Sequence, residues 1–442
     1  MRDTHLHPEL WHQVERQAEA VPQIYGRIDF TKMPERFTTT PSGDGIRGFE
    51  DRIPGIMADK HLIDMMAAYT LTGDTVADAY AAQIPNIGFR KLVSDLQLAC
   101  DKDVDAVADR VPELTPFMEA MEYVPSWLDM DLVCEGARIE RNHYANLVPF
   151  AIRGAFLATF MNTYSALPMS LTGQLTDSLA AKRVHETATF FTLTVMPGAL
   201  ERHGAAFKAA AMVRLMHSMV RFNVMQREGL WDASVYGVPI PQVDQMPAGQ
   251  IGSFLIAFRA LKEGRDRFTE EERARIEIGR YRCVLLGLPE PLLGDTPEAV
   301  ARLMLARQAT LRSAYDEAIC GPLVRGTMNT ELSFETSLPG RIDRELERSF
   351  SKAFFIQHFL QGDSRRAAKM GVKYTLKDRK LALIAATRIF SQLRLFGLLR
   401  DVPIIGDLAD RLLVGKLEGL LKRYGHAQFE THGETYRPSA AS

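Results

Sequence analysis

Apolar residues recur at helical spacing along almost the whole chain, whereas strand signals are scarce. The periodic segments are 58–82, 131–165, 178–197, 205–227, 270–287, 297–315, 345–361, 376–399 and 406–424. Thr269 and Glu272 have the spacing of a capping box, and Thr296 before Pro297 is typical of an N-cap followed by a first-turn proline. The sequence therefore predicts an all-α protein built around a large helical domain.

The length of the chain, 442 residues, is enough to bury a large core together with an internal pocket. Residues 1–57 are polar and weakly periodic, which predicts a weakly structured N-terminal extension. A single helical domain is predicted over 58–425, followed by a C-terminal tail over 426–442. The stretch 229–250 is rich in Pro and Gly, and we expect a long ordered loop there.

The overall composition narrows the functional class. A formal net charge of −2 gives no basic excess for nucleic-acid binding. Four cysteines without a C-x-x-C pair indicate neither a disulfide framework nor covalent haem attachment. The N-terminus shows neither an apolar signal region nor a twin-arginine start, so cytoplasmic residence is expected. The sequence does not indicate the oligomeric state.

Two apolar segments raise the question of a membrane. The charge-free run 154–176 reaches membrane-spanning length, but it contains Asn162, Pro168 and Gly173, and we interpret it as a buried helix and turn. The segment 393–423 is amphipathic, and docking on the protein core is favoured over contact with a membrane surface. The sequence therefore predicts no transmembrane segment, with peripheral membrane contact as an open alternative.

The helical segment 209–226 carries the clearest sign of a cofactor. Arg214, His217 and Arg221 lie on one helix face, accompanied by Val213 and Val220. One imidazole among apolar side chains suits the axial ligand of a haem iron, and two arginines suit the haem propionates. The competing interpretation is a core histidine beside two arginines in ordinary surface salt bridges.

The preceding helical segment, 180–191, strengthens the cofactor interpretation. Arg183, Glu186 and Thr187 also share one face, within apolar surroundings. Charged and hydroxyl groups are costly in such a place unless an ionic group lies between the two helices.

At this point the chain resembles the rubber oxygenase (latex clearing protein) family of haem b oxygenases, which includes the fungal mycophenolic-acid-pathway oxygenase. The resemblance covers roughly 120–310 and rests on an ordered set of short segments rather than on one motif. These segments are VPSWLDMDLVCEGARIE (124–140), LTGQL (171–175), Arg183 with Thr187, R-x-x-H-x-x-x-R (214–221), GVPIPQVD (237–244) and LLGLPEPLL (285–293). The family implies globin-like helical packing around a haem pocket.

The resemblance implies a role for each matching residue. His217 would be the proximal iron ligand of haem b, with Arg221 supporting it or a propionate, while Arg183 and Thr187 would line the opposite side. Rubber-cleaving members place a lysine one residue before that threonine, where it ligates the iron in a closed state. Glu186 stands there instead, which argues against a lysine-ligated state and against rubber as substrate. A carboxylate at that place is a candidate for proton transfer.

The resulting hypothesis is an oxygenase that uses O₂ on an apolar, alkene-bearing substrate of isoprenoid or lipid type, with oxidative C=C cleavage as the family's reaction. A helical haem or lipid carrier without turnover is the alternative from another class. A third alternative is a di-iron carboxylate site, because Glu140 and His143 form one E-x-x-H half-motif; such a site also needs a second E-x-x-H and two more glutamates that project inward. Hydrolase, phosphate-loop and dinucleotide motifs are absent from the sequence.

Overall fold

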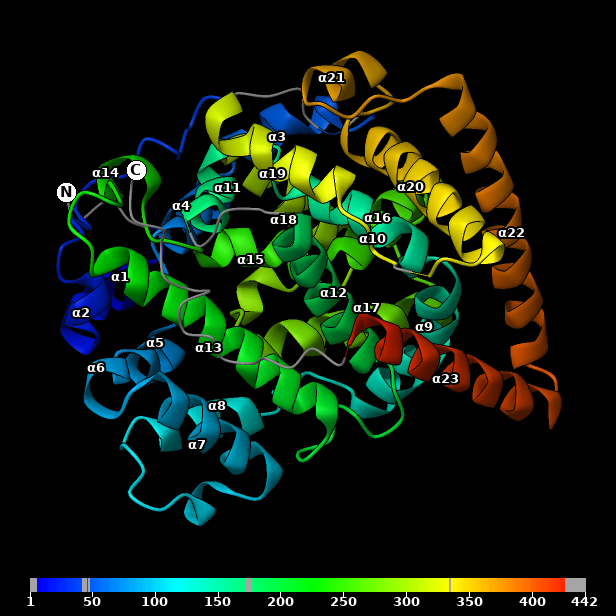
Figure 1. The fold of residues 1–442 in the computed structure, drawn as a ribbon. Helices are drawn as coiled ribbons and strands as arrows, with labels where there is room; N and C mark the ends of the chain where they lie inside the picture. Colours follow the sequence, from blue (N-terminus) through cyan, green and yellow to red (C-terminus); the bar gives the residue numbers. More distant parts are fainter. Residues whose placement is uncertain (1–5, 42–45, 47, 172–176, 334, 426–442) are drawn as a thin grey trace. The chain divides into compact units, whose positions relative to one another are not determined.

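Helices form the secondary structure of this computed structural model, which describes residues 6–41, 46, 48–171, 177–333 and 335–425 (Figure 1). Within those ranges no strand is formed, and Phe37 and Leu311 make an isolated antiparallel bridge. The all-α class predicted from the apolar periodicity is therefore confirmed. The predicted tail over 426–442 and residues 172–175 of the LTGQL segment lie outside the described ranges.

The first of two compact units comprises Met1–Gly136 and Glu201–Ala314. Its α-helices are α1 (Pro8–Ala20), α2 (Pro22–Tyr25), α3 (Ile53–Ala58), α4 (Lys60–Thr70), α5 (Thr75–Ala81), α6 (Ile84–Ile87), α7 (Phe89–Asp101), α8 (Leu114–Glu122), α13 (Ala205–Met225), α14 (Ala233–Tyr236), α15 (Gln242–Gly249), α16 (Ile251–Lys262), α17 (Glu270–Leu285) and α18 (Pro297–Thr310). Short 3₁₀ helices span Glu50–Arg52, Val104–Ala106 and Glu290–Leu292. Helix α13 packs against α2, α5, α7 and α17 and is thus the central helix of this unit.

The second unit comprises Ala137–Leu200 and the described residues from Tyr315 onward. Its helices are α10 (Val148–Ala158), α11 (Thr163–Leu171), α12 (Asp177–Leu193), α19 (Glu317–Asn329), α20 (Leu338–Phe359), α21 (Ser364–Lys369), α22 (Leu376–Arg400) and α23 (Ile405–Tyr424). Helix α9 (Met130–Asn146) begins in the first unit and ends in the second. The single domain predicted over 58–425 is therefore described as two units, and its status as one domain stays a prediction.

The N-terminal segment differs from the weakly structured extension predicted over 1–57. Helix α1 buries Trp11, Val14 and Gln17, and Trp11 donates a hydrogen bond from its indole Nε1 to Asp64 at 3.0 Å. Gln17 donates to the carbonyl of Leu71 at 2.9 Å. Hydrophobic periodicity misses this helix because only a narrow stripe of α1 is apolar, and buried polar contacts help to hold that stripe in place.

Two further local predictions have different outcomes. The capping box of Thr269 with Glu272 is present at the start of α17, and the side chain of Thr296 caps α18 before Pro297. The long loop predicted over 229–250 instead contains α14 and α15. Pro247 lies inside α15, a position at which the sequence rule expects a helix to end.

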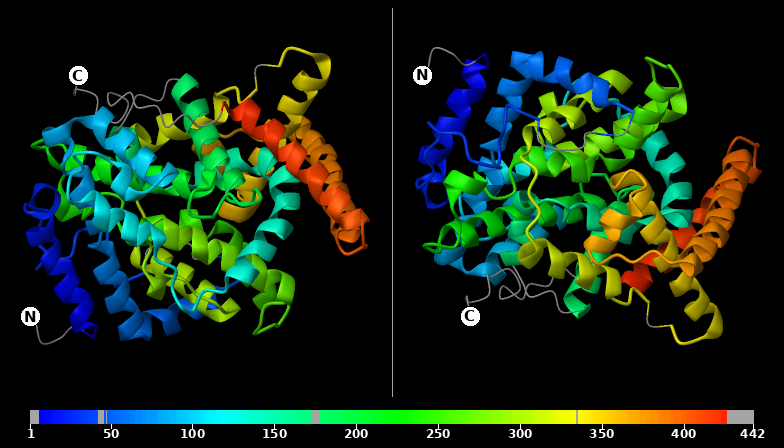
Figure 2. Two further views of the ribbon diagram at one scale, coloured as in Figure 1. Left: turned by 90° about the horizontal axis from the view of Figure 1, so that it is seen from below. Right: turned by 90° about the horizontal axis from the view of Figure 1, so that it is seen from above.

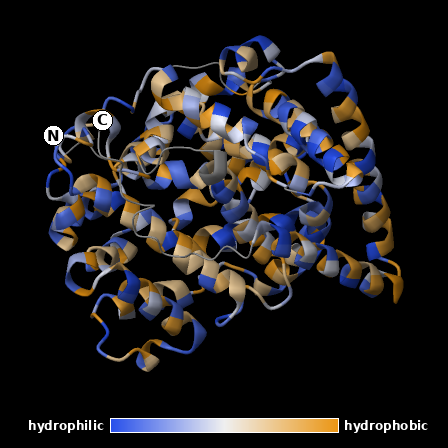
Figure 3. Ribbon diagram, viewed as in Figure 1, coloured by the Kyte–Doolittle hydropathy of each residue, from blue (hydrophilic) through white to orange (hydrophobic). Residues whose placement is uncertain are grey.

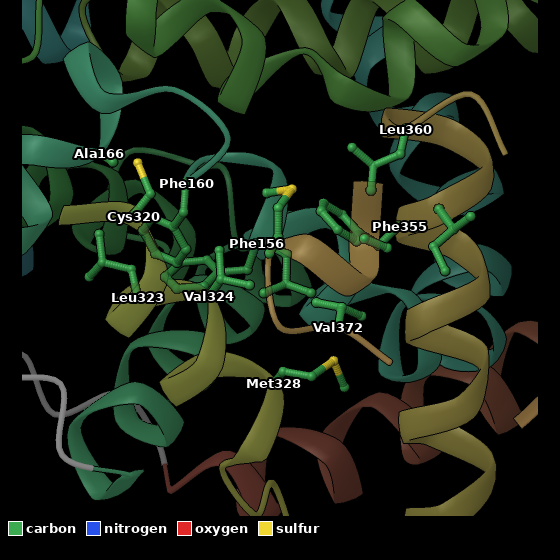
Figure 4. Packing of buried hydrophobic residues seen from close by; sticks show 14 of the residues in the cluster. Phe156, Phe160, Ala166, Cys320, Leu323, Val324, Met328, Phe355, Leu360 and Val372 are labelled. Atoms are coloured by element: carbon green, nitrogen blue, oxygen red, sulfur yellow. The ribbon is translucent and has the colours of Figure 1, made fainter. Parts of the chain in front are cut away.

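A well-packed apolar cluster organises the second unit and fixes α12. Figure 4 shows Phe156, Phe160, Val324 and Phe355 meeting at its centre, from α10, α19 and α20 and the residues beside them. Val184 of α12 belongs to the same cluster and is fully buried. Helix α12 is therefore anchored by its apolar face, which leaves its polar face pointing away from this core.

Candidate functional site

His217 lies in the middle of α13 with its ring oriented by one amide. The ring Nδ1 is 3.0 Å from Oε1 of Gln245 on α15, and an amide oxygen only accepts, so Nδ1 carries the proton. Burial lowers the pKa of His217 to about 4, and the positive charge of Arg221 acts in the same direction. The imidazole is therefore neutral at physiological pH, with the lone pair on Nε2.

The other ring nitrogen is suited to bind a metal. Among the described residues, no group is hydrogen-bonded to Nε2 of His217. Iron-ligating histidines commonly donate their remaining N–H to a carbonyl or carboxylate, which fixes the tautomer and the ring orientation. His217 and Gln245 have this arrangement, so the residues present fit one axial bond to a haem iron. Val220, one of the accompanying valines, is buried, and Val213 is half-buried.

The two arginines on either side of His217 are paired with carboxylates of α5 and its N-cap. Arg214 donates from Nε and Nη2 to both oxygens of Asp74, at 2.5 and 2.9 Å. Arg221 donates from Nε to Asp78 at 2.8 Å, with both side chains completely buried. The sequence assigns these guanidiniums to haem propionates, and that assignment stays a prediction. The contacts observed are those that lock α13 onto α5.

The Arg221 end of this network is extended by three more polar groups. Arg221 donates to Ser218 Oγ at 3.0 Å and to the carbonyl of Ile240 at 3.1 Å. The hydroxyl of Tyr25 donates to Asp78. Ile240 has a φ of +50°, which a β-branched residue rarely adopts. This strained backbone is held in place partly by the hydrogen bond that its carbonyl accepts from Arg221.

The Arg214 end is closed by a glycine that has no room for a side chain. Gly287 has a φ of +78°, and a Cβ on it would lie 2.7 Å from both Arg214 Nε and Asp74 Oδ2. Gln242 donates to the carbonyls of Gly73 and Gly287, at 2.9 and 3.2 Å. Burial works to raise the pKa of Asp74, but Arg214 holds that pKa below its ordinary value. The pair is therefore charged and tightly enclosed.

Three of the segments that carry the family resemblance meet at this network. The segment 214–221 supplies the two arginines and His217, the segment 237–244 supplies Ile240 and Gln242, and the segment 285–293 supplies Gly287. Asp74, Asp78 and Gln245 complete the network but were not singled out by the sequence. Their only sequence signal is the four-residue spacing of the two aspartates within a periodic helix.

The residues predicted to line the side of the haem opposite His217 lie on α12, in the second unit. Arg183, Glu186 and Thr187 are half-buried on α12. Burial raises the pKa of Glu186, opposed by Lys182 and then by Arg183. Lys182 Nζ is 3.9 Å from the Glu186 carboxylate. His217 and these three residues of α12 belong to different units.

The competing metal interpretation gains no support from the described residues. Glu140 and His143 lie one turn apart on α9. Across the described ranges, no three His, Cys, Asp or Glu side chains are grouped so that they could hold a metal ion. A di-iron centre needs four carboxylates and two histidines. A haem iron needs one protein ligand, so the lack of a three-residue metal cluster among the described residues does not argue against His217 as a haem ligand.

Comparison with known proteins assigns the class. The family described as ER-bound oxygenase mpaB/B′/Rubber oxygenase, catalytic domain, matches residues 141–354. Residues 141–354 of this chain therefore match the catalytic domain of the rubber oxygenase family. The match includes α12, α13 and the segments around Gln245 and Gly287, whereas the segment 124–140 lies before it. No curated protein is significantly similar to the chain in sequence.

A solved structure extends the likeness to the fold. The chain resembles a structure described as latex clearing protein LCP in the closed state, with a TM-score of 0.54 and 18% sequence identity. The similarity covers 79% of this chain and 91% of that chain. The helical architecture predicted for the family is confirmed.

Proposed function

We propose that this protein is a haem b-dependent oxygenase that acts with O₂ on an apolar, alkene-bearing substrate of isoprenoid or lipid type. The observation that carries the proposal is the ring of His217, which is half-buried and neutral and is oriented through Nδ1 by Gln245. Oxidative cleavage of a carbon–carbon double bond is the reaction class that the family suggests. Cytoplasmic residence stays a prediction.

Haem b held on one imidazole supplies the activation of O₂, and the protein's residues supply position and proton control. His217 would hold the group through Nε2. Gln245 keeps the ring in the required tautomer, and the Arg214–Asp74 and Arg221–Asp78 pairs keep α13 in place. These four charged residues are positioning residues, because each arginine is held by one of the aspartates.

Glu186 is the candidate for moving a proton. Its pKa is raised by burial, so its carboxylate is a better proton acceptor than an exposed one. Lys182 and Arg183 lie on the same helix and favour the charged, accepting form. The hydroxyl of Thr187, one residue further on, can donate or accept a hydrogen bond beside it.

The test combines a cofactor measurement with a product measurement. The purified protein is expected to show a Soret band and a b-type pyridine haemochrome. Incubated with squalene as an isoprenoid probe under ¹⁸O₂, it is expected to form carbonyl products that carry the label. A haem protein that gives no oxygen-dependent product from isoprenoid or lipid alkenes would be a carrier. A colourless protein with about two irons per chain would support the E-x-x-H alternative.

A further inference from the structure

Helices α22 and α23 form a hairpin whose outer side is strongly apolar. Figure 3 shows hydrophobic residues along both helices, and Lys416 of α23 donates to Gln392 of α22, so the two helices meet beside their shared turn (Figure 2). One of the described helices, α22, is long and apolar enough to cross a membrane, judged by length and composition. Only 17% of its most apolar stretch is buried. A soluble helix of this kind normally buries its apolar residues.

The apolar residues of α22 lie on two opposite faces. Ala385 and Ile389 are buried against Leu346 and Phe350 of α20. The exposed residues, on the other side, are Leu376, Leu383, Ile384, Phe390, Leu395 and Leu398. Packing on α20 explains the first face and leaves the second without a partner among the described residues. Docking on the core, as predicted for 393–423, therefore accounts for only part of the apolar surface.

The turn between the helices continues the exposed face. Ile404 is 86% exposed, and its φ of +67° is one that a β-branched residue rarely adopts. Leu408 and Leu412, on the next two turns of α23, are 58% and 60% exposed. We call Leu395, Leu398, Ile404, Leu408 and Leu412 the apolar tip. An isoleucine held outward in a strained turn is the kind of outlier that marks a functional surface.

Charge identifies the partner of this surface. Residues 376–424 contain ten Lys and Arg against five Asp and Glu, in a chain whose net charge is −2. Lys380 and Arg394 fall on the exposed apolar side of α22, and no ion pair involves either of them among the described residues. Aliphatic residues interleaved with unneutralised cations are typical of helices that lie on anionic lipid surfaces.

We propose that the α22–α23 hairpin docks this protein peripherally on an anionic phospholipid bilayer, with the apolar tip inserted between the headgroups. Lys380 and Arg394 would reach lipid phosphates while their aliphatic stems stay in the apolar layer. A spanning orientation conflicts with the packing of Ala385 and Ile389 on α20. A second copy is disfavoured because self-pairing would bring the cations of both copies together.

The test is sedimentation of the full-length protein with vesicles of phosphatidylcholine alone or mixed with phosphatidylglycerol. The wild type is expected to bind the mixed vesicles and to be released as salt increases. Ile404→Asp combined with Leu408→Asp should lower binding by roughly tenfold or more per side chain, because each loses its apolar burial. Aspartate tolerates a positive φ, so the variant keeps its turn. Tyr123→Asp, an equally exposed position in the first unit, is the matched control and should bind normally.

Reversing the two cations separates the electrostatic contribution. Lys380→Glu with Arg394→Glu should weaken binding to the mixed vesicles and leave the low binding to neutral vesicles unchanged. The proposal is overturned if the wild type binds neither vesicle, or if the aspartate pair binds as the wild type does. It is also overturned if sedimentation equilibrium shows an oligomer that the aspartate pair dissociates, because the face would then join copies of this chain.

Discussion

Replacing Gly287 by alanine tests whether the buried Arg214–Asp74 ion pair is as tightly enclosed as the geometry indicates. A Cβ at this position would lie 2.7 Å from Arg214 Nε and Asp74 Oδ2, closer than real Cβ contacts. The positive φ costs an alanine about 1–2 kcal/mol, and forcing a packed group to move costs about 1–3 kcal/mol more. Gly287→Ala is therefore expected to destabilise the first unit by roughly 2–5 kcal/mol.

Gly229 provides the matched control because it isolates the backbone contribution. Its φ is +74°, and a Cβ there would meet nothing within 4 Å. Gly229→Ala should therefore cost only the positive-φ penalty. In thermal unfolding followed by circular dichroism, Gly287→Ala should melt roughly 2–10 °C below Gly229→Ala. Asp74→Ala should remove most of this difference by making space. Equal melting temperatures of the two glycine variants would refute the close packing at Asp74 and Arg214.

Four further outcomes are expected. Glu186→Gln should retain haem and reduce turnover by about 10²–10⁴-fold, and wild-type turnover would remove Glu186 from the mechanism. In the wild type, turnover should fall with decreasing pH at a higher pH than an ordinary carboxyl would give, because burial raises the pKa of Glu186. The lowered pKa of His217 gives a contribution to folding that is full above about pH 6.5 and is lost as the pH falls towards about 4. In apoprotein that circular dichroism shows to be still folded, the imidazole stays neutral and uptake of haem should be constant down to about pH 5. A decline that begins near pH 6.5 in the folded apoprotein would contradict the lowered pKa of His217. Gln245→Leu should leave Nδ1 of His217 unpaired and weaken haem retention about 10–100-fold, whereas an unchanged haem dissociation rate would show that Gln245 does not support the ligand.

The sequence predicts the helical class and the elements that carry the site, because apolar periodicity and capping chemistry are local properties. It also indicates His217 as the candidate ligand, because helical spacing places the histidine between two arginines and the family resemblance favours an iron ligand over a core histidine. It does not identify the partners of those arginines. Asp74 and Asp78 are about 140 residues away in the chain and reach α13 only through tertiary packing. A guanidinium binds a haem propionate and a protein carboxylate in the same way, so the sequence does not show which of them is the partner.

The same limit applies to the ends of the chain. Helix α1 was not expected, because its packing relies on buried polar contacts of Trp11 and Gln17 that no periodicity reveals. The amphipathic segment 393–423 predicts a docked helix, and α23 in that segment buries Leu413, Leu417 and Leu420. The sequence shows that α22 is apolar on two faces. Only the structure shows that one of these faces is covered by α20 and the other is exposed.

The central claim, that haem b is bound through His217, is tested most directly by the absorption spectrum of purified His217→Gly beside the wild type and His143→Ala. The wild type and His143→Ala should show the same Soret band and one haem per chain, because His143 belongs only to the E-x-x-H half-motif. His217→Gly should lose haem, since the single protein–iron bond is removed, and added imidazole should restore the band by occupying the vacated space. A His217→Gly protein that keeps full haem with an unchanged Soret band would contradict the assignment.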